Sequence, residues 1–383
     1  MIVGNLHGKR VLVVQRRMTH YRVKFFELLR ARLEQEGCEL ILAYGQGTSQ
    51  EAQKDDSAEI PWAVKLPTKY FFGGRVCWQP FGNLLNNADV VVVTAENKLI
   101  YNLVVQLLVQ KKKKALWGHG ANLQGNKKSL RERFKKVMAL HADWWFAYTE
   151  RSAALVRATG FDPLKITVLN NSVDTTEVRI QIDRMDARCK VDLKKRFDVG
   201  SNNVGVFVGS LYPEKRLDFL VDAADLIRKK VQDFELLIVG DGPDSDYIQS
   251  AATTRPWLHY FGALKGGRKV EVISLAKVFL NPGLVGLGVL DSFACRVPLV
   301  TTDCELHSPE ISYLQNGHNG LIVDNTLEAY SSAVTELLLD GEKLNRLVVG
   351  CERDYAIYTL EGMVDKFAGG LNSMMAPASA DLH

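Results

Sequence analysis

Short apolar segments rich in β-branched residues alternate with helical patterns along almost the whole chain. Such alternation favours parallel sheets covered by helices on both faces. Helical spacing is clearest over 215–230, where Leu217, Leu220, Ala224 and Ile227 recur at intervals of three and four residues. The pattern predicts strands at 10–14, 39–44, 89–94, 115–117, 144–148, 166–169, 204–208, 235–239, 259–261, 278–281, 299–302 and 321–323. We therefore expect an α/β chain with two doubly wound parallel sheets.

The length of the chain sets the number of domains. Its 383 residues exceed one ordinary α/β core and fit two domains of roughly 150 to 200 residues each. The weakest pattern, polar and mixed in charge, lies over 174–203 and marks the connection. We predict an N-terminal domain over 1–185 and a C-terminal domain over 190–350, with a helix at about 355–375 as a candidate to pack back on the first domain.

Charge is unevenly distributed between the two halves. Residues 1–185 hold 28 lysines and arginines against 17 acids, whereas the remainder holds 20 against 27. A basic half suits nucleic acid, anionic lipid or an anionic substrate. No stacking platform of aromatic residues accompanies the cations, which disfavours nucleic acid.

Other features place the chain among reduced, water-soluble proteins. Apolar runs are far shorter than the ~20 residues of a bilayer span, and the N-terminus lacks the pattern of a leader. Six scattered cysteines without a C-x-x-C pair indicate free thiols, with neither a zinc site nor a disulfide framework. We expect a cytoplasmic protein.

The segment 111–141 is the most basic part of the chain. Ten cations and one acid lie between 111 and 136, and Ser129 and Glu132 have the spacing of a capping box, which predicts a helix there. A basic amphipathic helix can lie on an anionic membrane surface. An ordinary surface helix is the alternative, and both interpretations stay open.

Several motifs follow predicted strands, where ligands of open α/β sheets bind. In VGSLYPEKRL, Lys215 and Arg216 open a helix, which is unfavourable for cations unless an anion lies there. In NPGLVGLGVLDSF, residues 286–288 suit either an anion-binding nest or a tight turn, and Asp291 follows one turn later. His119 stands between two glycines after a strand, in a position that fits a ligand contact or a structural turn.

Taken in order, these motifs resemble one family, the retaining glycosyltransferases of family 4, also called group 1. Their GT-B fold has two Rossmann-like domains facing a cleft. The resemblance rests on VGSLYPEKRLDFLVDAA, LLIVGDGP, YFG, PGLVGLGVLDSFACRVPLVTTD and SPEISYLQNGHNGLIV, with LKITVLNNSVDT and WGHG in the first half.

The resemblance implies an enzyme that moves a sugar from a nucleotide-sugar to a glycan or lipid-linked acceptor, in cell-surface polysaccharide or glycolipid synthesis. It also implies no need for a metal or other cofactor. Peripheral contact with the inner face of the cell membrane is expected from the basic segment 111–141. Lys215, assisted by Arg216, would neutralise the departing diphosphate, and His119 would approach the donor sugar. The implied donor-binding residues are Gly209, Ser210, Gly286, Leu287, Gly288 and Asp291.

The chain departs from the family pattern at several positions. Ser210 replaces an arginine, Asp291 replaces a glutamate, and the loop is about three residues too short for a second glutamate, whose role we assign to Glu310. Arg296 replaces a glycine, and QRRMTHYRVKFF replaces a glycine-rich loop. Two alternatives follow: an inactive GT-B protein that binds a nucleotide-sugar, or a nucleotide-sugar 2-epimerase, which would need acid and base groups at the sugar.

Overall fold

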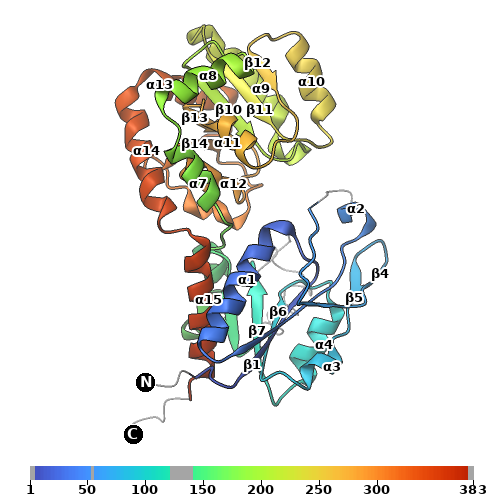
Figure 1. Cartoon of the computed structure of the whole chain (residues 1–383). Coiled ribbons are helices and arrows are strands. Elements are labelled where there is room, and N and C mark those ends of the chain that lie inside the picture. Colours follow the sequence, from blue (N-terminus) through green and yellow to red (C-terminus); the bar gives the residue numbers. More distant parts are fainter. Residues whose placement is uncertain (1–4, 53–55, 121–140, 378–383) are drawn as a thin grey trace. The chain divides into compact units, whose positions relative to one another are not determined.

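The computed structural model describes residues 5–52, 56–120 and 141–377, and the chain divides into two compact units, 1–174 with 360–383, and 175–359 (Figure 1). The elements of the first unit are β1 (Arg10–Gln15), α1 (His20–Gln35), β2 (Glu39–Tyr44), α2 (Ser49–Ala52), β3 (Val64–Lys65), β4 (Lys69–Phe71), β5 (Val76–Trp78), α3 (Gly82–Leu85), β6 (Val90–Thr94), α4 (Ile100–Leu108), β7 (Lys113–Gly118), β8 (Trp144–Ala147), α6 (Glu150–Arg157), η1 (Pro163–Lys165), β9 (Ile166–Val168) and α15 (Leu360–Met375).

The first unit is built on a seven-stranded parallel sheet with the order β3-β2-β1-β6-β7-β8-β9. All five residues of β6, Val90–Thr94, are buried because both faces of the sheet are covered. The direction of the strand order reverses between β1 and β6. This reversal is the switch point at which open α/β sheets bind ligands.

The C-terminal helix α15 belongs to the first unit, where it packs on α1, β8 and β9. The ring of Phe367 stacks on Phe146, with 4.3 Å between centroids, and lies 5.2 Å from the ring of Trp117. These contacts join the end of the chain to the core of its first unit.

The second unit carries a six-stranded parallel sheet with the order β12-β11-β10-β13-β14-β15, and its switch point lies between β10 and β13. Its elements are α7 (Thr176–Asp183), α8 (Ala187–Phe197), β10 (Val204–Val208), η2 (Pro213–Lys215), α9 (Leu217–Lys230), β11 (Glu235–Val239), α10 (Ser245–Thr253), β12 (Leu258–Tyr260), α11 (Gly267–Ile273), β13 (Val278–Leu280), α12 (Gly288–Cys295), β14 (Leu299–Thr302), η3 (Pro309–Tyr313), β15 (Gly320–Val323), α13 (Leu327–Leu339) and α14 (Gly341–Tyr355).

The unit boundary differs from the one expected between 185 and 190. The first unit ends at Asp174, because α7 packs on α11 and α12 of the second unit. Arg179 of α7 supports this packing by donating to the Ala294 carbonyl of α12 at 3.4 Å and by forming an ion pair with Glu352 of α14. The second unit likewise continues to Thr359 rather than to 350.

All twelve predicted strands are present, and the sequence missed β3, β4 and β5. These three strands are two or three residues long, which is too short for a periodic pattern. The six cysteines are free thiols. Within the described ranges, none of the helices has the length and apolar character needed to cross a bilayer.

Candidate functional site

Two loops are bonded to each other at the switch point of the second sheet. The Leu284 N–H, after β13, donates to the Glu214 carbonyl, after β10, at 2.8 Å. A Cβ at Gly283 would lie 2.2 Å from the same carbonyl oxygen, so this close approach requires glycine. The Lys215 ammonium completes the junction by donating to the Leu284 carbonyl. The neighbouring strand ends therefore form one connected structure.

Lys215 is a buried cation, with 8% of its surface exposed at the end of η2. Within the described part of the chain it forms no ion pair with a carboxylate, and its ammonium lies 5.6 Å from the Tyr212 ring centroid. Burial lowers the pKa of Lys215 to about 8. Because a buried charge without a counter-charge is unfavourable, this position suits an anionic ligand.

Backbone donors are available in the loop that Lys215 contacts. The N–H groups of Gly286, Leu287 and Gly288 donate no hydrogen bond to any residue that the structure describes. Gly288 begins α12, and a Cβ placed on it would have no heavy atom within 4 Å. Unbonded N–H groups at a helix N-terminus bind anions.

His307 holds this loop in place, and the sequence analysis missed it. The Val285 N–H donates to Nδ1 of His307 at 3.1 Å, and Nε2 lies 2.8 Å from the Thr302 carbonyl oxygen. Because Nδ1 is an acceptor, we assign the proton to Nε2, which then donates to Thr302. Val285 also accepts from the Ser308 N–H at 3.0 Å. The one available signal was a histidine shortly after a strand end.

Cys304 lies beside this histidine, with Sγ 3.6 Å from Nε2 of His307. Burial raises the pKa of the Cys304 thiol, but hydrogen bonds, first of all with His307, outweigh this effect and lower it to about 7. The loop after β14 therefore carries a second group that titrates near neutral pH.

Arg216 points toward β14 and β15 rather than toward the Leu284 carbonyl. It precedes α9 with φ 56°, and its guanidinium donates to Asn325 and, at 3.4 Å, to Thr302. It also stacks over Phe219 at 4.3 Å. The two adjacent cations that the sequence grouped together thus have different surroundings.

The remaining predicted donor residues lie in the same unit. Gly209 donates its N–H to Val239 at 3.0 Å, and Ser210 after it is exposed. Asp291 on α12 forms an ion pair with Lys269 of α11 at 2.9 Å. Glu310 is buried within η3.

The departure at Arg296 has a structural explanation. Arg296 ends α12 in the left-handed conformation, with φ 58°, which is where a glycine is usual. Its side chain forms ion pairs with Asp183, at 2.7 Å, and with Glu352. The guanidinium therefore ties α12 to α7 and α14.

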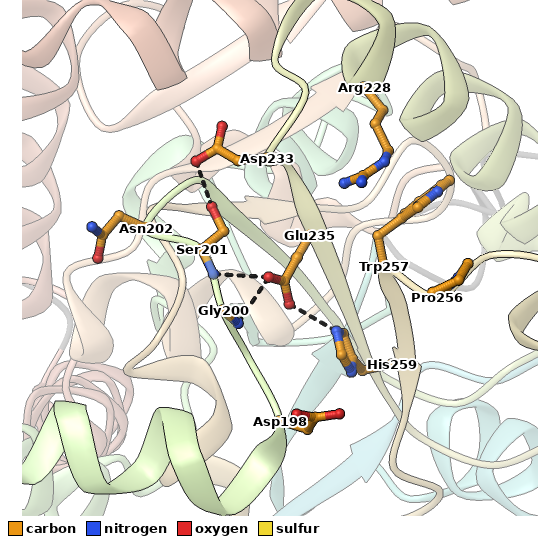
Figure 2. A pocket seen from close by; sticks show the side chains of 10 residues that line it. All are labelled: Asp198, Gly200, Ser201, Asn202, Arg228, Asp233, Glu235, Pro256, Trp257 and His259. Carbon is orange, nitrogen blue, oxygen red and sulfur yellow. Dashed lines mark hydrogen bonds and ion pairs between the residues drawn. The ribbon is translucent and has the colours of Figure 1, made fainter.

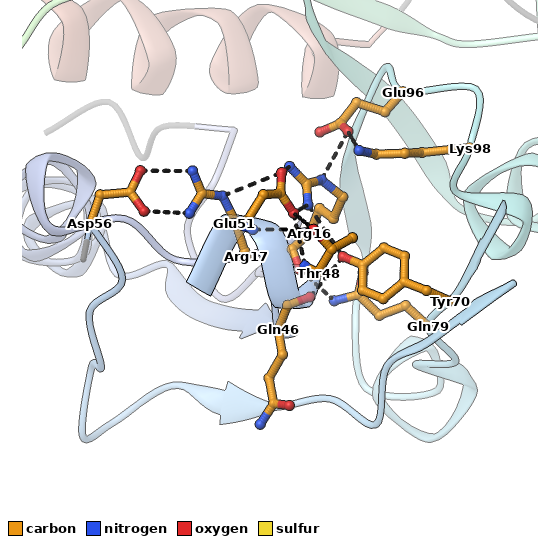
Figure 3. A network of polar contacts seen from close by, with 10 residues as sticks. All are labelled: Arg16, Arg17, Gln46, Thr48, Glu51, Asp56, Tyr70, Gln79, Glu96 and Lys98. Atoms are coloured by element: carbon orange, nitrogen blue, oxygen red, sulfur yellow. Dashed lines mark hydrogen bonds and ion pairs between the residues drawn. The ribbon is translucent and has the colours of Figure 1, made fainter. Parts of the chain in front are cut away.

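The switch point of the first sheet carries an ion-pair network instead of a glycine-rich loop (Figure 3). Arg16, directly after β1, donates to both carboxylate oxygens of Glu51 at 2.7 Å and to Glu96, after β6, at 3.0 Å. The hydrogen bonds from Arg16 hold the pKa of Glu51 at about 2. Arg17 pairs with Asp56 at 2.6 Å.

A pocket of about 440 Å³ lies beside this network. Charged and hydrogen-bonding side chains line it, among them Arg17, Tyr44, Gln46, Glu59 and Lys65. A polar pocket with paired charges of both signs fits a polyhydroxylated ligand, whose hydroxyl groups both donate and accept.

His119 lies at the end of β7 and is exposed. Its ring packs edge-on against Tyr148, with 4.4 Å between centroids. The buried Arg22 guanidinium lies 5.7 Å from the same Tyr148 ring and donates to Asn171 at 2.6 Å. These contacts position the histidine at the carboxyl end of its strand, in the first unit.

The structure describes only part of the basic segment 111–141. Residues 121–140, which include the predicted helix at Ser129, lie outside the described residues. Lys114 is buried and donates to the Gln106 carbonyl at 2.7 Å, and Lys112 donates to Ala88. Lys111 and Lys113 are exposed, and Lys113 lies 3.8 Å from the carboxylate of Asp143.

A second cavity, of about 350 Å³, opens at the opposite end of the second sheet, where β10, β11 and β12 begin (Figure 2). Glu235 accepts from the Gly200 and Ser201 N–H groups and lies 2.8 Å from Nε2 of His259. The hydrogen bonds of the Glu235 carboxylate are thus made within the protein, and they connect the start of β11 to the loop before β10.

Comparison with known proteins agrees with the fold and the motifs. Residues 202–340 match the family model for "Glycosyl transferases group 1". A GDP-mannose-dependent alpha-(1-6)-phosphatidylinositol monomannoside mannosyltransferase of Mycobacterium tuberculosis is 30% identical over 207 residues, which are 49% of this chain and 50% of the relative. The chain thus matches about half the length of such curated relatives.

Two solved structures share the fold over nearly the whole chain. A glycosyltransferase of Rickettsia africae superposes with a TM-score of 0.71 at 15% identity, covering 97% of this chain and 99% of that one. Anabaena HepE in complex with UDP gives 0.67 at 13% identity, covering 95% and 100%. The ordered motifs, the two Rossmann-like units and these similarities show that the chain has the GT-B fold and that its residues 202–340 are those of a group 1 glycosyltransferase.

Proposed function

We propose that this protein transfers a sugar from a nucleotide-sugar donor to a glycan or lipid-linked acceptor, with retention of anomeric configuration, in cell-surface polysaccharide or glycolipid synthesis. The observation that carries the proposal is the buried Lys215 ammonium. It forms no ion pair with any described carboxylate and contacts the loop that presents the Gly286, Leu287 and Gly288 amides.

Charge development explains why such a site would promote transfer. Cleavage of the bond between sugar and diphosphate leaves negative charge on the departing group. A fixed cation and fixed N–H dipoles stabilise that charge without reorganising in the transition state. In this proposal Lys215 and the three amides meet the diphosphate, and Arg216 adds a second positive charge nearby.

The other named residues take roles around this centre. We assign donor contacts to Gly209, Ser210, Asp291 and Glu310, and a contact with the transferred sugar to His119 of the first unit. Lys269 already holds Asp291, so the ribose contact requires Asp291 to keep one oxygen lone pair available. The polar pocket beside Arg17 suits the acceptor.

Relatives support the substrate class. Anabaena HepE has been solved with UDP-glucose, and the Mycobacterium relative uses GDP-mannose and acts on a phosphatidylinositol monomannoside. The proposal therefore names the donor as a nucleotide-sugar and extends the acceptor to lipid-linked glycans. A lipid-linked acceptor would be met at the inner face of the membrane.

The decisive experiment measures release of nucleoside diphosphate from UDP- and GDP-sugars in the presence of extracted glycolipids. Lys215→Ala should lower kcat about 100- to 1000-fold, in the range known for loss of one group that stabilises developing charge. Lys229→Ala, at an exposed position near the end of α9, serves as the matched control and should retain turnover. Normal turnover of a folded Lys215→Ala variant would refute the proposed role.

The same assay separates the two alternatives. A binding protein without activity would be stabilised by nucleoside diphosphates but would release none when acceptor is added. A 2-epimerase would convert the donor without any acceptor. Turnover that persists in EDTA is also expected, because the proposal gives the neutralising role to Lys215 and the amides rather than to a resident metal.

A further inference from the structure

The hairpin β4–β5 presents an apolar surface that the fold covers only in part, where the Trp78 ring packs edge-on against Tyr101 of α4 with 5.2 Å between centroids. Strand register pairs Phe71 with Val76, and Lys69 with Trp78, on one face. Phe71 is 46% exposed, Trp78 is 38% exposed, and Phe72 at the tip is 80% exposed. We name the side chains of Phe71, Phe72 and Trp78 the hairpin aromatics. Three exposed aromatic rings on one short hairpin form an apolar patch rather than scattered surface residues.

The opposite face of the hairpin fixes it to the first unit. Cys77 is fully buried, and its N–H donates to the Lys98 carbonyl at 2.7 Å. The Tyr70 hydroxyl donates to the Gln46 carbonyl at 2.7 Å and accepts from Arg16 at 3.2 Å. One face is therefore anchored, and the hairpin itself lies at the margin of the unit (Figure 1).

The tip keeps an aromatic side chain where the backbone disfavours one. Phe72 and Gly73 have φ of 52° and 64°, and the Gly74 N–H donates to Phe71 at 3.1 Å, so the turn has positive φ at both central positions. Such turns prefer Asn-Gly, and a phenylalanine in this conformation costs about 1 kcal/mol. A strained and exposed phenylalanine points to a function outside the fold.

The charges around the hairpin indicate its partner. From 60 to 88 the chain contains three cations, Lys65, Lys69 and Arg75, and no acid. Lys65 pairs with Glu59, whereas Lys69 and Arg75 are exposed and form no ion pair with any residue that the structure describes. Aromatic rings flanked by unpaired cations match the boundary of an anionic bilayer, where rings enter the headgroup region and cations meet lipid phosphates.

We propose that the β4–β5 hairpin docks the protein on anionic lipid bilayers by inserting the hairpin aromatics, with Lys69 and Arg75 on the headgroups. This inference does not depend on the proposed transfer reaction. It also differs from contact through 111–141, because every residue that carries it lies in the hairpin.

The test is sedimentation of the full chain with vesicles of phosphatidylglycerol or of phosphatidylcholine. Binding to phosphatidylglycerol and weak binding to phosphatidylcholine are expected. Phe72→Asn should lower the partition coefficient roughly tenfold, since one ring is lost from the interface. It creates the preferred Asn-Gly turn, so the melting temperature should stay equal or rise. Loss of binding cannot then be attributed to unfolding.

Two matched controls make the result specific. Leu164→Asn removes a side chain that is 85% exposed elsewhere in the first unit, and it should leave binding within twofold. Each cation near an anionic surface contributes about fivefold to the partition coefficient. The double variant Lys69→Glu with Arg75→Glu should therefore lower the partition coefficient at least tenfold. Lys24→Glu with Arg151→Glu makes the same change of net charge at exposed positions away from the hairpin and should have a much smaller effect.

Three outcomes would overturn the proposal. The first is a wild-type chain that does not sediment with phosphatidylglycerol at moderate salt. The second is binding that Phe72→Asn and the double charge reversal leave unchanged. The third is self-association that Phe72→Asn abolishes, which would assign the hairpin aromatics to a second copy of the chain.

Discussion

The Val285 N–H donates to Nδ1 of His307 at 3.1 Å, so an imidazole from the loop after β14 holds the loop after β13. Its other nitrogen is satisfied by the Thr302 carbonyl at 2.8 Å. The imidazole therefore connects two strand ends: Nδ1 accepts a hydrogen bond from one loop, and Nε2 donates a hydrogen bond to the end of β14. The Gly286, Leu287 and Gly288 amides follow directly after the residue that it holds.

This relationship predicts different behaviour of two amide variants at position 307. His307→Asn places an acceptor close to the position of Nδ1, whereas His307→Gln places its amide near Nε2 and leaves the Val285 N–H unbonded. Titration calorimetry with UDP and GDP should show a loss of affinity of about tenfold for His307→Gln, the cost of one buried donor. His307→Asn should lose less than threefold. Equal losses in the two variants would mean that Val285 does not depend on the histidine.

Lys215→Met is expected to stabilise the protein while it removes function. The depressed pKa, about 8 against 10.5, means that the folded state holds the charged form at a cost. At pH 7 the substitution should raise the unfolding free energy by about 1 to 3 kcal/mol. The Leu284 carbonyl retains the Asn281 side-chain amide as a donor at 3.0 Å, so no buried acceptor is orphaned.

The stability difference between Lys215→Met and the wild type should depend on pH. The unfolded chain binds a proton at Lys215 up to its ordinary pKa, whereas the folded chain releases it above about 8. Wild-type stability should therefore rise between pH 8 and 10.5, and the advantage of Lys215→Met should shrink over that range. Calorimetric melting of both proteins at several pH values measures the difference. An advantage that does not change with pH would contradict the depressed pKa.

Affinity for a nucleoside diphosphate should have the opposite dependence. Because the pKa of Lys215 is lowered to about 8, the ammonium loses its charge progressively around this pH, and the Kd for UDP or GDP should increase as the pH rises through that range. Cys304, with its pKa lowered to about 7, would add a negative charge over a neighbouring range. Measuring the profile in Cys304→Ser isolates the lysine. A profile that is flat from pH 7 to 9 in this variant would exclude Lys215 from the anion contact.

Much of the fold could be predicted from the sequence because buried parallel strands are short, continuous apolar runs. The four valines of β6 and the VGVFV run of β10 are such runs. The strand-end motifs could be placed for the same reason, since a strand end fixes the location of the loop after it. The structure accordingly brings Lys215 to the loop at 284–288.

What could not be predicted depends on side-chain direction and on contacts distant in sequence. Arg216 and Lys215 are adjacent, but Arg216 turns toward Asn325 because its own φ is 56°. Arg16 and Glu96 meet because β1 and β6 are neighbours across the switch point. The pairing of Arg296 with Asp183 requires α7 to lie beside α12, which also moved the unit boundary.

The network at Arg16 leads to a prediction about acid stability. Glu51 accepts from both terminal nitrogens of Arg16 at 2.7 Å and from the Thr48 N–H at 2.9 Å, and its pKa is about 2 against a usual 4.5. A lowered folded pKa contributes stability that is present above 4.5 and is lost as the pH falls toward 2. Glu51→Gln should therefore lower the unfolding free energy at pH 7 by about 1 to 2 kcal/mol, after allowance for partial exposure.

Scanning calorimetry at pH 7 and at pH 3.5 checks the direction of this change. The difference between wild type and Glu51→Gln should be largest at pH 7 and should shrink at pH 3.5, where protonation of the unfolded carboxyl already removes part of the gain. Glu59→Gln is the matched control, because its ion pair with Lys65 is exposed and should contribute little to stability. If the two variants melt together at pH 7, the Arg16 network does not stabilise the switch point of the first sheet.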